Sequence, residues 1–234
     1  MDKNNIKMSL LSIKLGFWSS FLFTIMGIGY GLGMGIFFAK YSIPMWTNIE
    51  SYADFMKSKP QLFFSLCQIT AFLSGLIFIV LLNSIHEYAQ DEKKVLTRIG
   101  MCFGTIFIVL ASITYFVQFT VVPQNISNGS LGGLEQFVEL NTKSFIAAIV
   151  ILGWGLFLGL TSFFIAPVFS NGKLEIYIKW LFIFNGVFCI MNTIGYMLQN
   201  VELSLISTAF YGLALTLAGI LLCILFRKLK HSKC

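Results

Sequence analysis

The chain has 234 residues, of which 57% are hydrophobic and 11% charged, and its formal net charge is +6. A typical soluble domain is about 45–50% apolar and about 25% charged, so a soluble globule of this composition would lack the polar side chains to cover its surface. The composition therefore excludes a soluble enzyme, a nucleic-acid-binding domain and a disordered chain, and it predicts an integral membrane protein.

Six apolar blocks follow one another along the chain, each close to the roughly 20 residues that a membrane-spanning helix needs. They cover residues 15–39, 62–82, 99–122, 145–169, 178–198 and 203–226, and within them only Lys179 is charged. The connections between the blocks are short. We therefore expect one membrane domain over residues 1–234, an all-α bundle of six transmembrane helices whose first block is an uncleaved span.

The basic residues are distributed unevenly between the two sides of such a bundle. Most fall before the first block, in the second and fourth connections and after the last block: Lys3, Lys7, Lys14, Lys93, Lys94, Arg98, Lys173, Lys179, Arg227, Lys228, Lys230 and Lys233. The opposite side carries Lys40, Lys57, Lys59 and Lys143. Because cytoplasmic loops are enriched in Lys and Arg, this distribution predicts that both termini are cytoplasmic.

Two connections on the outer side have features of their own. The first is expected to hold a short helix, because Thr47 and Glu50 have capping-box spacing and an apolar stripe follows at Ile49, Tyr52, Ala53 and Met56. The third is rich in Pro, Asn and Gly from residue 123 to 133, which predicts an irregular turn, with a short helix expected over residues 134–140. Asn125 and Asn128 begin glycosylation sequons in this turn.

The first block contains a run of glycines at four-residue spacing, Gly27, Gly31 and Gly35, and the fourth block repeats the spacing at Gly155 and Gly159. Small residues at this spacing let membrane helices approach closely. We interpret them as helix-packing positions inside the bundle. A homo-oligomer formed through the first span, or flexibility needed for opening, is the alternative.

A polar stripe on the fifth block is the strongest candidate for a functional site. Asn185, Cys189, Asn192, Tyr196 and Gln199 are three or four residues apart, so they share one helical face. Lipid cannot satisfy a carboxamide, so this face is expected to point inward. Asn192 would lie about 10 Å from the outer end of its span, at about 1.5 Å of rise per residue.

Polar side chains of other blocks also concentrate toward the outer side, whereas residues 75–82 carry none. The additional candidates for ligand binding are Gln68, Gln118, Tyr30, Tyr115 and Tyr211. One hypothesis is an outer-half cavity that hydrogen-bonds a small neutral or amphipathic molecule or a lipid. The other is that these groups hydrogen-bond between helices and only hold the bundle together.

The sequence offers no catalytic residue and predicts no cofactor and no metal site. The blocks contain neither an acid nor a histidine, which argues against a carboxylate proton relay and a membrane protease. His86-Glu87 begins like the HExxH zinc pattern, but position 90 is Gln. A weak metal site there is the less favoured alternative to a solvated helix that extends the second span.

Two classes of function stay open at this stage. The first is a facilitator or transporter of a small neutral or amphipathic solute. The second is a sensor, accessory subunit or scaffold that transports nothing, and an intramembrane enzyme ranks below both. The expected partners are the lipid bilayer and such a solute, with no nucleic acid. The abundance of Lys, Asn, Ile and Phe favours a bacterial inner membrane.

Overall fold

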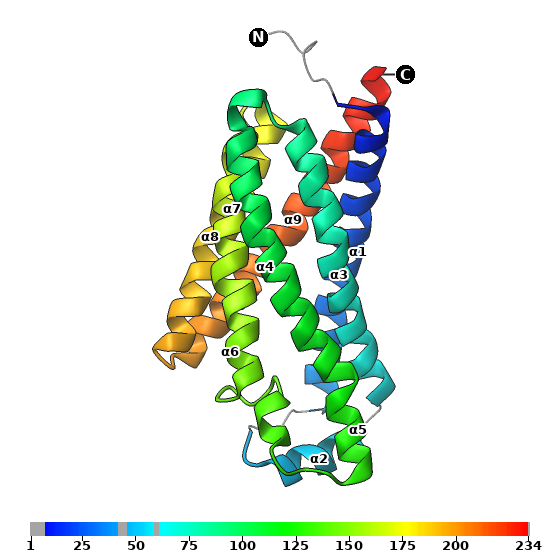
Figure 1. Cartoon of the computed structure of the whole chain (residues 1–234), viewed down its shortest axis with the longest axis vertical. Coiled ribbons are helices and arrows are strands. Elements are labelled where there is room, and N and C mark those ends of the chain that lie inside the picture. The colour runs from blue at the N-terminus through cyan, green and yellow to red at the C-terminus, as the bar shows by residue number, and fades with distance from the viewer. Residues whose placement is uncertain (1–7, 42–45, 59–60, 234) are drawn as a thin grey trace.

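The computed structural model describes residues 8–41, 46–58 and 61–233, and within these ranges the regular structure is entirely helical (Figure 1). Six helices are long and apolar enough to cross a membrane, as predicted. Five of the spans are built on α1 (Leu10–Tyr41), α3 (Gln61–Tyr88), α4 (Lys94–Phe119), α8 (Lys173–Met197) and α9 (Val201–Lys233). The other joins α6 (Phe145–Ile151), the π-helical η4 (Leu152–Phe157) and α7 (Leu158–Ile165). Their apolar outer surfaces contact the lipid bilayer, so the chain is a multi-pass membrane protein.

The spanning helices extend beyond the apolar blocks on the side of the chain termini. The helix of the second block continues through His86 to Tyr88, which confirms the expected extension. The 3-10 helix η2 (Asp91–Lys93) then leads into α4. The His86 ring Nδ1 lies 2.6 Å from the Thr97 hydroxyl, and the described residues contain no cluster of three acidic, Cys or His side chains that could hold a metal ion.

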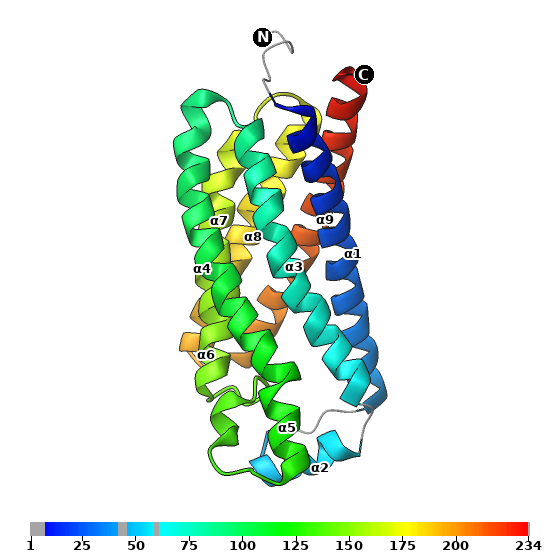
Figure 2. The same ribbon diagram turned by 45° about the vertical axis from the view of Figure 1, so that its right-hand side comes forward.

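The spans follow one another around a common axis in chain order, each packing against the next, and α1 packs against α9 (Figure 2). Close contacts join these two helices near the termini, because Gly16 leaves room for the Phe226 ring and Gly219 for the Thr24 side chain. Farther from the termini the last glycine contact is Gly27 with Thr216, whereas Gly31 and Gly212 have open space beside them. The first and last helices therefore diverge toward the opposite end, as the diagonal course of α9 in Figure 1 shows.

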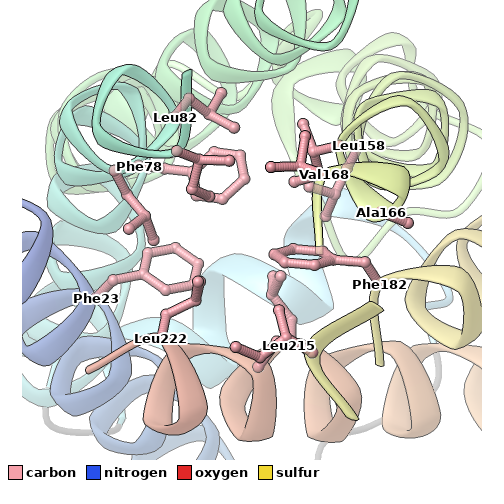
Figure 3. Close-up of a cluster of buried hydrophobic side chains, with 14 of the residues drawn as sticks. Phe23, Phe78, Leu82, Leu158, Ala166, Val168, Phe182, Leu215 and Leu222 are labelled. Atoms are coloured by element: carbon pink, nitrogen blue, oxygen red, sulfur yellow. The ribbon is translucent and has the colours of Figure 1, made fainter. Parts of the chain in front are cut away.

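Aromatic and aliphatic side chains fill the axis of the bundle. Phe23 of α1, Phe78 of α3, Phe182 of α8 and Leu222 of α9 are buried and point toward one another (Figure 3). The Phe23 and Phe78 ring centroids are 5.2 Å apart, and Phe78 meets Phe107 edge-on at 5.8 Å. Close packing of these buried rings stabilises the fold. The side chains labelled in Figure 3 are all apolar, so they offer no hydrogen-bonding group to this half of the axis.

Glu175 closes the end of the bundle where the termini lie. Its carboxylate accepts the main-chain N–H groups of Ser170 and Asn171 at 3.1 and 2.9 Å, and the Tyr88 hydroxyl is a further partner. It thereby fixes the turn between η5 (Ala166–Val168) and α8 to the end of α3.

The opposite end is covered by α2 (Ile49–Lys57), α5 (Val121–Asn128) and η3 (Leu134–Phe137). The short helix in the first connection is confirmed, and its buried residues include Tyr52, Ala53 and Met56. Its N-cap is Asn48 rather than Thr47, because the Asn48 side chain accepts the Ser51 N–H at 2.8 Å.

The structure of the third connection differs from the irregular turn that the sequence predicts. Residues 121–128 form α5 instead of an irregular turn, and the helix ends at Gly129, which has a φ of 72°. Asn125 and Asn128, the two sequon residues, lie on this helix, and the Asn125 amide donates to the Val121 carbonyl. The short helix expected over 134–140 is a single 3-10 turn, after which the backbone becomes extended at Val138.

Candidate functional site

Asn185 ties three helices together at the middle of the bundle. Its Oδ1 accepts the Ser162 hydroxyl of α7 at 2.7 Å, and its Nδ2 donates to the Tyr211 carbonyl of α9 at 2.9 Å. The side chain is fully buried, with Cys189 at 3.7 Å as a weaker donor. Both polar ends of Asn185 are therefore satisfied by protein, and this residue has the geometry of a packing contact.

Asn192 lies on the same face of α8 about two helical turns away, and its surroundings differ. It is also buried, but neither its Oδ1 nor its Nδ2 has a hydrogen-bond partner. Gly195 contacts Ser204, and Asn185 bonds to Tyr211. These two contacts fix the antiparallel register of α8 and α9, which places Ser207 at about the same level of the bundle as Asn192. The buried Ser207 hydroxyl is unpartnered as well.

Trp154 is presented by the π-helical segment of the fourth span. Gly153 and Gly155 flank it, and each lets a neighbouring helix come close: the Leu110 side chain approaches Gly153, and the Cys189 carbonyl of α8 approaches Gly155. The Trp154 indole N–H is buried without a partner. Because π-helical turns are uncommon and recur at functional sites, this segment marks Trp154 as a candidate site residue.

A chain of aromatic rings runs from Trp154 across the axis. Its centroid lies 6.2 Å from Tyr211 and 6.4 Å from Tyr115, and Tyr115 lies 6.2 Å from Tyr30. The hydroxyls of Tyr30 and Tyr115 are hydrogen-bond partners. Three of the predicted ligand-binding residues are thus brought together by α1, α4 and α9.

Gln118 and Gln68 face the loop that follows η3. The Gln118 Nε2 donates to the Phe137 carbonyl at 2.7 Å, and its Oε1 accepts the Glu139 main-chain N–H at 3.2 Å. Gln68 of α3 is a hydrogen-bond partner of the Glu139 carboxylate, while its buried Oε1 is unpartnered. These two glutamines hold the loop over the end of the bundle.

Glu139 is a site residue that the sequence did not reveal. Desolvation raises the pKa of its half-buried carboxyl to about 7, although the Gln68 hydrogen bond acts in the opposite direction. It interacts electrostatically with Tyr30, Tyr115 and Tyr211. The nearest signal in the sequence is its position between two apolar residues, since an acid in a solvated loop more often has polar neighbours.

Two members of the predicted stripe stay outside this cluster. The Tyr196 hydroxyl donates to the Thr142 carbonyl at 2.9 Å and so anchors the end loop to α8. Gln199 is exposed in the turn between α8 and α9, where its φ is 55°.

The glycines predicted to pack between helices fall into two groups, one closely packed and one with open space beside it. Gly155 and Gly159 pack closely against α8, and a Cβ built on Gly159 would lie 3.1 Å from the Cys189 Cβ and 3.3 Å from the Gly186 carbonyl oxygen. Gly31 and Gly35 have nothing within 4 Å, and Gly27 has only ordinary contact with Thr216. The expectation of packing inside the bundle is therefore wrong for Gly31 and Gly35 only, because α9 turns away from this part of α1.

The buried polar atoms without partners define the candidate site. Among the described residues they belong to Tyr52, Gln68, Trp154, Asn192 and Ser207, which by their positions in their helices all lie in the half of the bundle away from the termini. An unpaired buried polar group costs on the order of 1–3 kcal/mol, so several in one region indicate a place prepared for water or a ligand. Comparison of the chain with protein-family models, with curated proteins and with solved structures gives no match.

Proposed function

We propose that this multi-pass membrane protein is a facilitator or transporter of a small amphipathic solute, which binds in the outer half of the bundle. The observation that carries the proposal is the group of unpartnered buried polar atoms around Asn192, Ser207 and Trp154. If these groups only packed the helices together, their polar atoms would be hydrogen-bonded to protein, as those of Asn185 are. The divergence of α1 from α9 beside them favours a solute with an apolar part that enters from the bilayer.

The proposed orientation places both chain ends in the cytoplasm. Lys93, Lys94, Lys173 and Arg227 lie at the end of the bundle that holds the termini, and Lys143 at the other. The end covered by α2 and α5 then faces outward, and the site opens on that side of the membrane.

The apolar axis around Phe23, Phe78, Phe182 and Leu222 supports a second candidate, a sensor or accessory subunit that binds a ligand without moving it. A transporter has to part these side chains during each cycle. A non-transporting protein keeps them closed, and access to the site is then always from one side.

Cysteine accessibility tests the proposal. In a variant without the native cysteines, reconstituted in lipid vesicles, Ser207→Cys is treated with a small, neutral, membrane-impermeant methanethiosulfonate. We expect modification at Ser207→Cys and none at Leu222→Cys, which is 1% exposed in the apolar half. Leu213→Cys, 56% exposed on the lipid side of the same helix, is the second control.

The side from which the reagent acts distinguishes the two candidates. Modification of Ser207→Cys from either face of the membrane supports transport by alternating access. Modification only from the face covered by α2 and α5 supports the sensor or subunit. Absence of reaction from both faces, in a variant that remains folded, contradicts a solute site altogether.

A further inference from the structure

The outer end of the bundle holds a desolvated carboxyl group, that of Glu139, which receives no counter-charge from the described residues. Glu139 makes no ion pair with any cation of the described residues, where the single salt bridge joins Lys94 to Asp91. The described basic residues at the same end, Lys40, Lys57 and Lys143, are exposed to solvent. Gln68 is instead a hydrogen-bond partner of the Glu139 carboxylate, which also interacts electrostatically with tyrosines of α1, α2, α4 and α9.

Desolvating a carboxylate without a counter-ion costs free energy, and a protein normally offsets that cost with a pair or with several hydrogen-bond donors. The Glu139 main-chain N–H is not such a donor, because it donates to the Gln118 Oε1. Without a partner this carboxyl keeps its proton up to about pH 7, whereas a bound cation would supply the counter-charge that keeps it ionised.

The neighbouring rings suit a positively charged molecule. A cation within about 6 Å of an aromatic ring is attracted by the ring quadrupole, and several rings together recognise alkylated ammonium groups. Tyr30, Tyr115, Trp154 and Tyr211 form an unbroken series with centroid separations of 6.2 to 6.4 Å. Glu139 interacts with the three tyrosines of this series.

The unpartnered atoms supply the remaining contacts. The unpartnered Gln68 Oε1 is able to accept a hydrogen bond from an ammonium N–H. Asn192 offers both a donor and an acceptor beside the Ser207 hydroxyl, which suits an uncharged polar group at the other end of the molecule.

We propose that the solute is an organic cation, an alkylammonium whose charged head binds between Glu139 and the rings of Tyr30 and Tyr115. Its uncharged polar end reaches Asn192 and Ser207. This inference rests on the proposed solute site and specifies its chemistry.

The test compares two reagents of opposite charge at Ser207→Cys in the cysteine-free background. The trimethylammonium-ethyl and the sulfonatoethyl methanethiosulfonates are both small, and each rate is normalised to the same reagent's rate with a free thiol. We expect the cationic reagent to react at least about tenfold faster, within the range that electrostatic focusing gives in charged clefts. Glu139→Gln should remove that preference.

Matched variants test whether the cation preference depends on the Glu139 charge rather than on a change in the fold. Glu135→Gln, in the same loop, should leave the rate ratio unchanged. Tyr115→Phe keeps the ring and should keep most of the preference, whereas Tyr115→Leu should reduce it. The monodisperse elution of each variant in detergent shows that it is folded.

The possible results lead to different conclusions. Equal normalised rates for the two reagents, or a cation preference that survives Glu139→Gln, would overturn the cation site but leave the solute site standing. Failure of both of these charged reagents and of the neutral reagent at Ser207→Cys would overturn the solute site itself. The two proposals therefore fail in distinguishable ways.

Discussion

The Gln118 side chain on α4 holds the main chain of Glu139, because its Oε1 accepts the Glu139 N–H at 3.2 Å while its Nε2 donates to Phe137 at 2.7 Å. A membrane-embedded amide thus sets the position of a carboxylate that belongs to a loop. This relationship makes the loop part of the candidate site.

Gln118→Ala should loosen that loop without unfolding the bundle. Loss of two hydrogen bonds, each worth about 0.5–1.5 kcal/mol, leaves the Phe137 carbonyl and the Glu139 N–H unpaired. Hydrogen exchange of the amides of residues 134–144 should become faster in the purified protein. Gln124→Ala, on the exposed face of α5, is the control and should leave exchange unchanged; equal exchange in both variants would contradict the anchoring role.

The two buried asparagines of α8 should respond differently to replacement by alanine. Asn185→Ala breaks bonds to Ser162 and Tyr211 and leaves a cavity, so it should lower the free energy of unfolding by about 1–3 kcal/mol. Asn192→Ala leaves a similar cavity, but it breaks no hydrogen bond to protein and removes two unpaired polar atoms, so it should lower the free energy of unfolding by less, at most about 1 kcal/mol. Unfolding in mixed detergent micelles measures both, and a similar large loss in Asn192→Ala would favour the packing interpretation of the stripe.

The raised pKa of Glu139 predicts a pH-dependent stability. The folded state binds this proton up to about pH 7, whereas an unfolded glutamate releases it near pH 4.5. Between these values the native state holds more protons, so this carboxyl makes stability decrease as the pH rises and then level off above about pH 7. Glu139→Gln should flatten that slope in thermal melts from pH 4 to pH 8, while Glu135→Gln should keep it.

The glycines of the first and fourth spans should differ in their tolerance of a methyl group. Gly155→Ala forces the Thr193 side chain to move and brings a Cβ to 3.2 Å from the Cys189 carbonyl oxygen, so it should cost about 1–3 kcal/mol of stability. Gly31→Ala meets open space and should be close to neutral. Thermal unfolding in detergent compares the two, and a large loss at Gly31 would show that this surface is covered by another molecule.

The orientation can be checked in cells. A phosphatase reporter inserted after Gly132 should be active outside the membrane, and one fused to the C-terminus should be inactive, because most basic residues lie with the termini. The opposite pattern would place the candidate site on the cytoplasmic side and contradict the proposed outward opening of the site.

The six spans could be predicted because each is a long apolar run with charges only at or near its ends. The arrangement of the helices around an axis could not, since it depends on which faces pack together. The α5 helix was missed because Pro123 suggested a turn; proline is tolerated in a first helical turn, where its missing N–H has no partner to lose.

The candidate site was predictable only in part. Spacing brings Asn185 and Asn192 to one face, but it cannot show that the first is satisfied by Ser162 and Tyr211 and the second by nothing. Glu139 was beyond sequence reasoning, because its burial results from a loop that folds back onto Gln118 and Gln68. Periodicity likewise cannot reveal the π-helical turn that positions Trp154.

The contact between α1 and α9 joins the first and the last of the six described spans, and α9 is synthesised after the other five. Until α9 enters the bilayer, the inward face of α8 with Asn185 and Asn192 has no helix to cover it on that side, and the Tyr211 carbonyl that Asn185 needs does not exist. A chain stalled before residue 201 would therefore present carboxamides to lipid or to whatever holds nascent spans in the membrane. Insertion of α9 closes the ring of six spans between α8 and α1, and it should be the step at which this bundle becomes resistant to degradation.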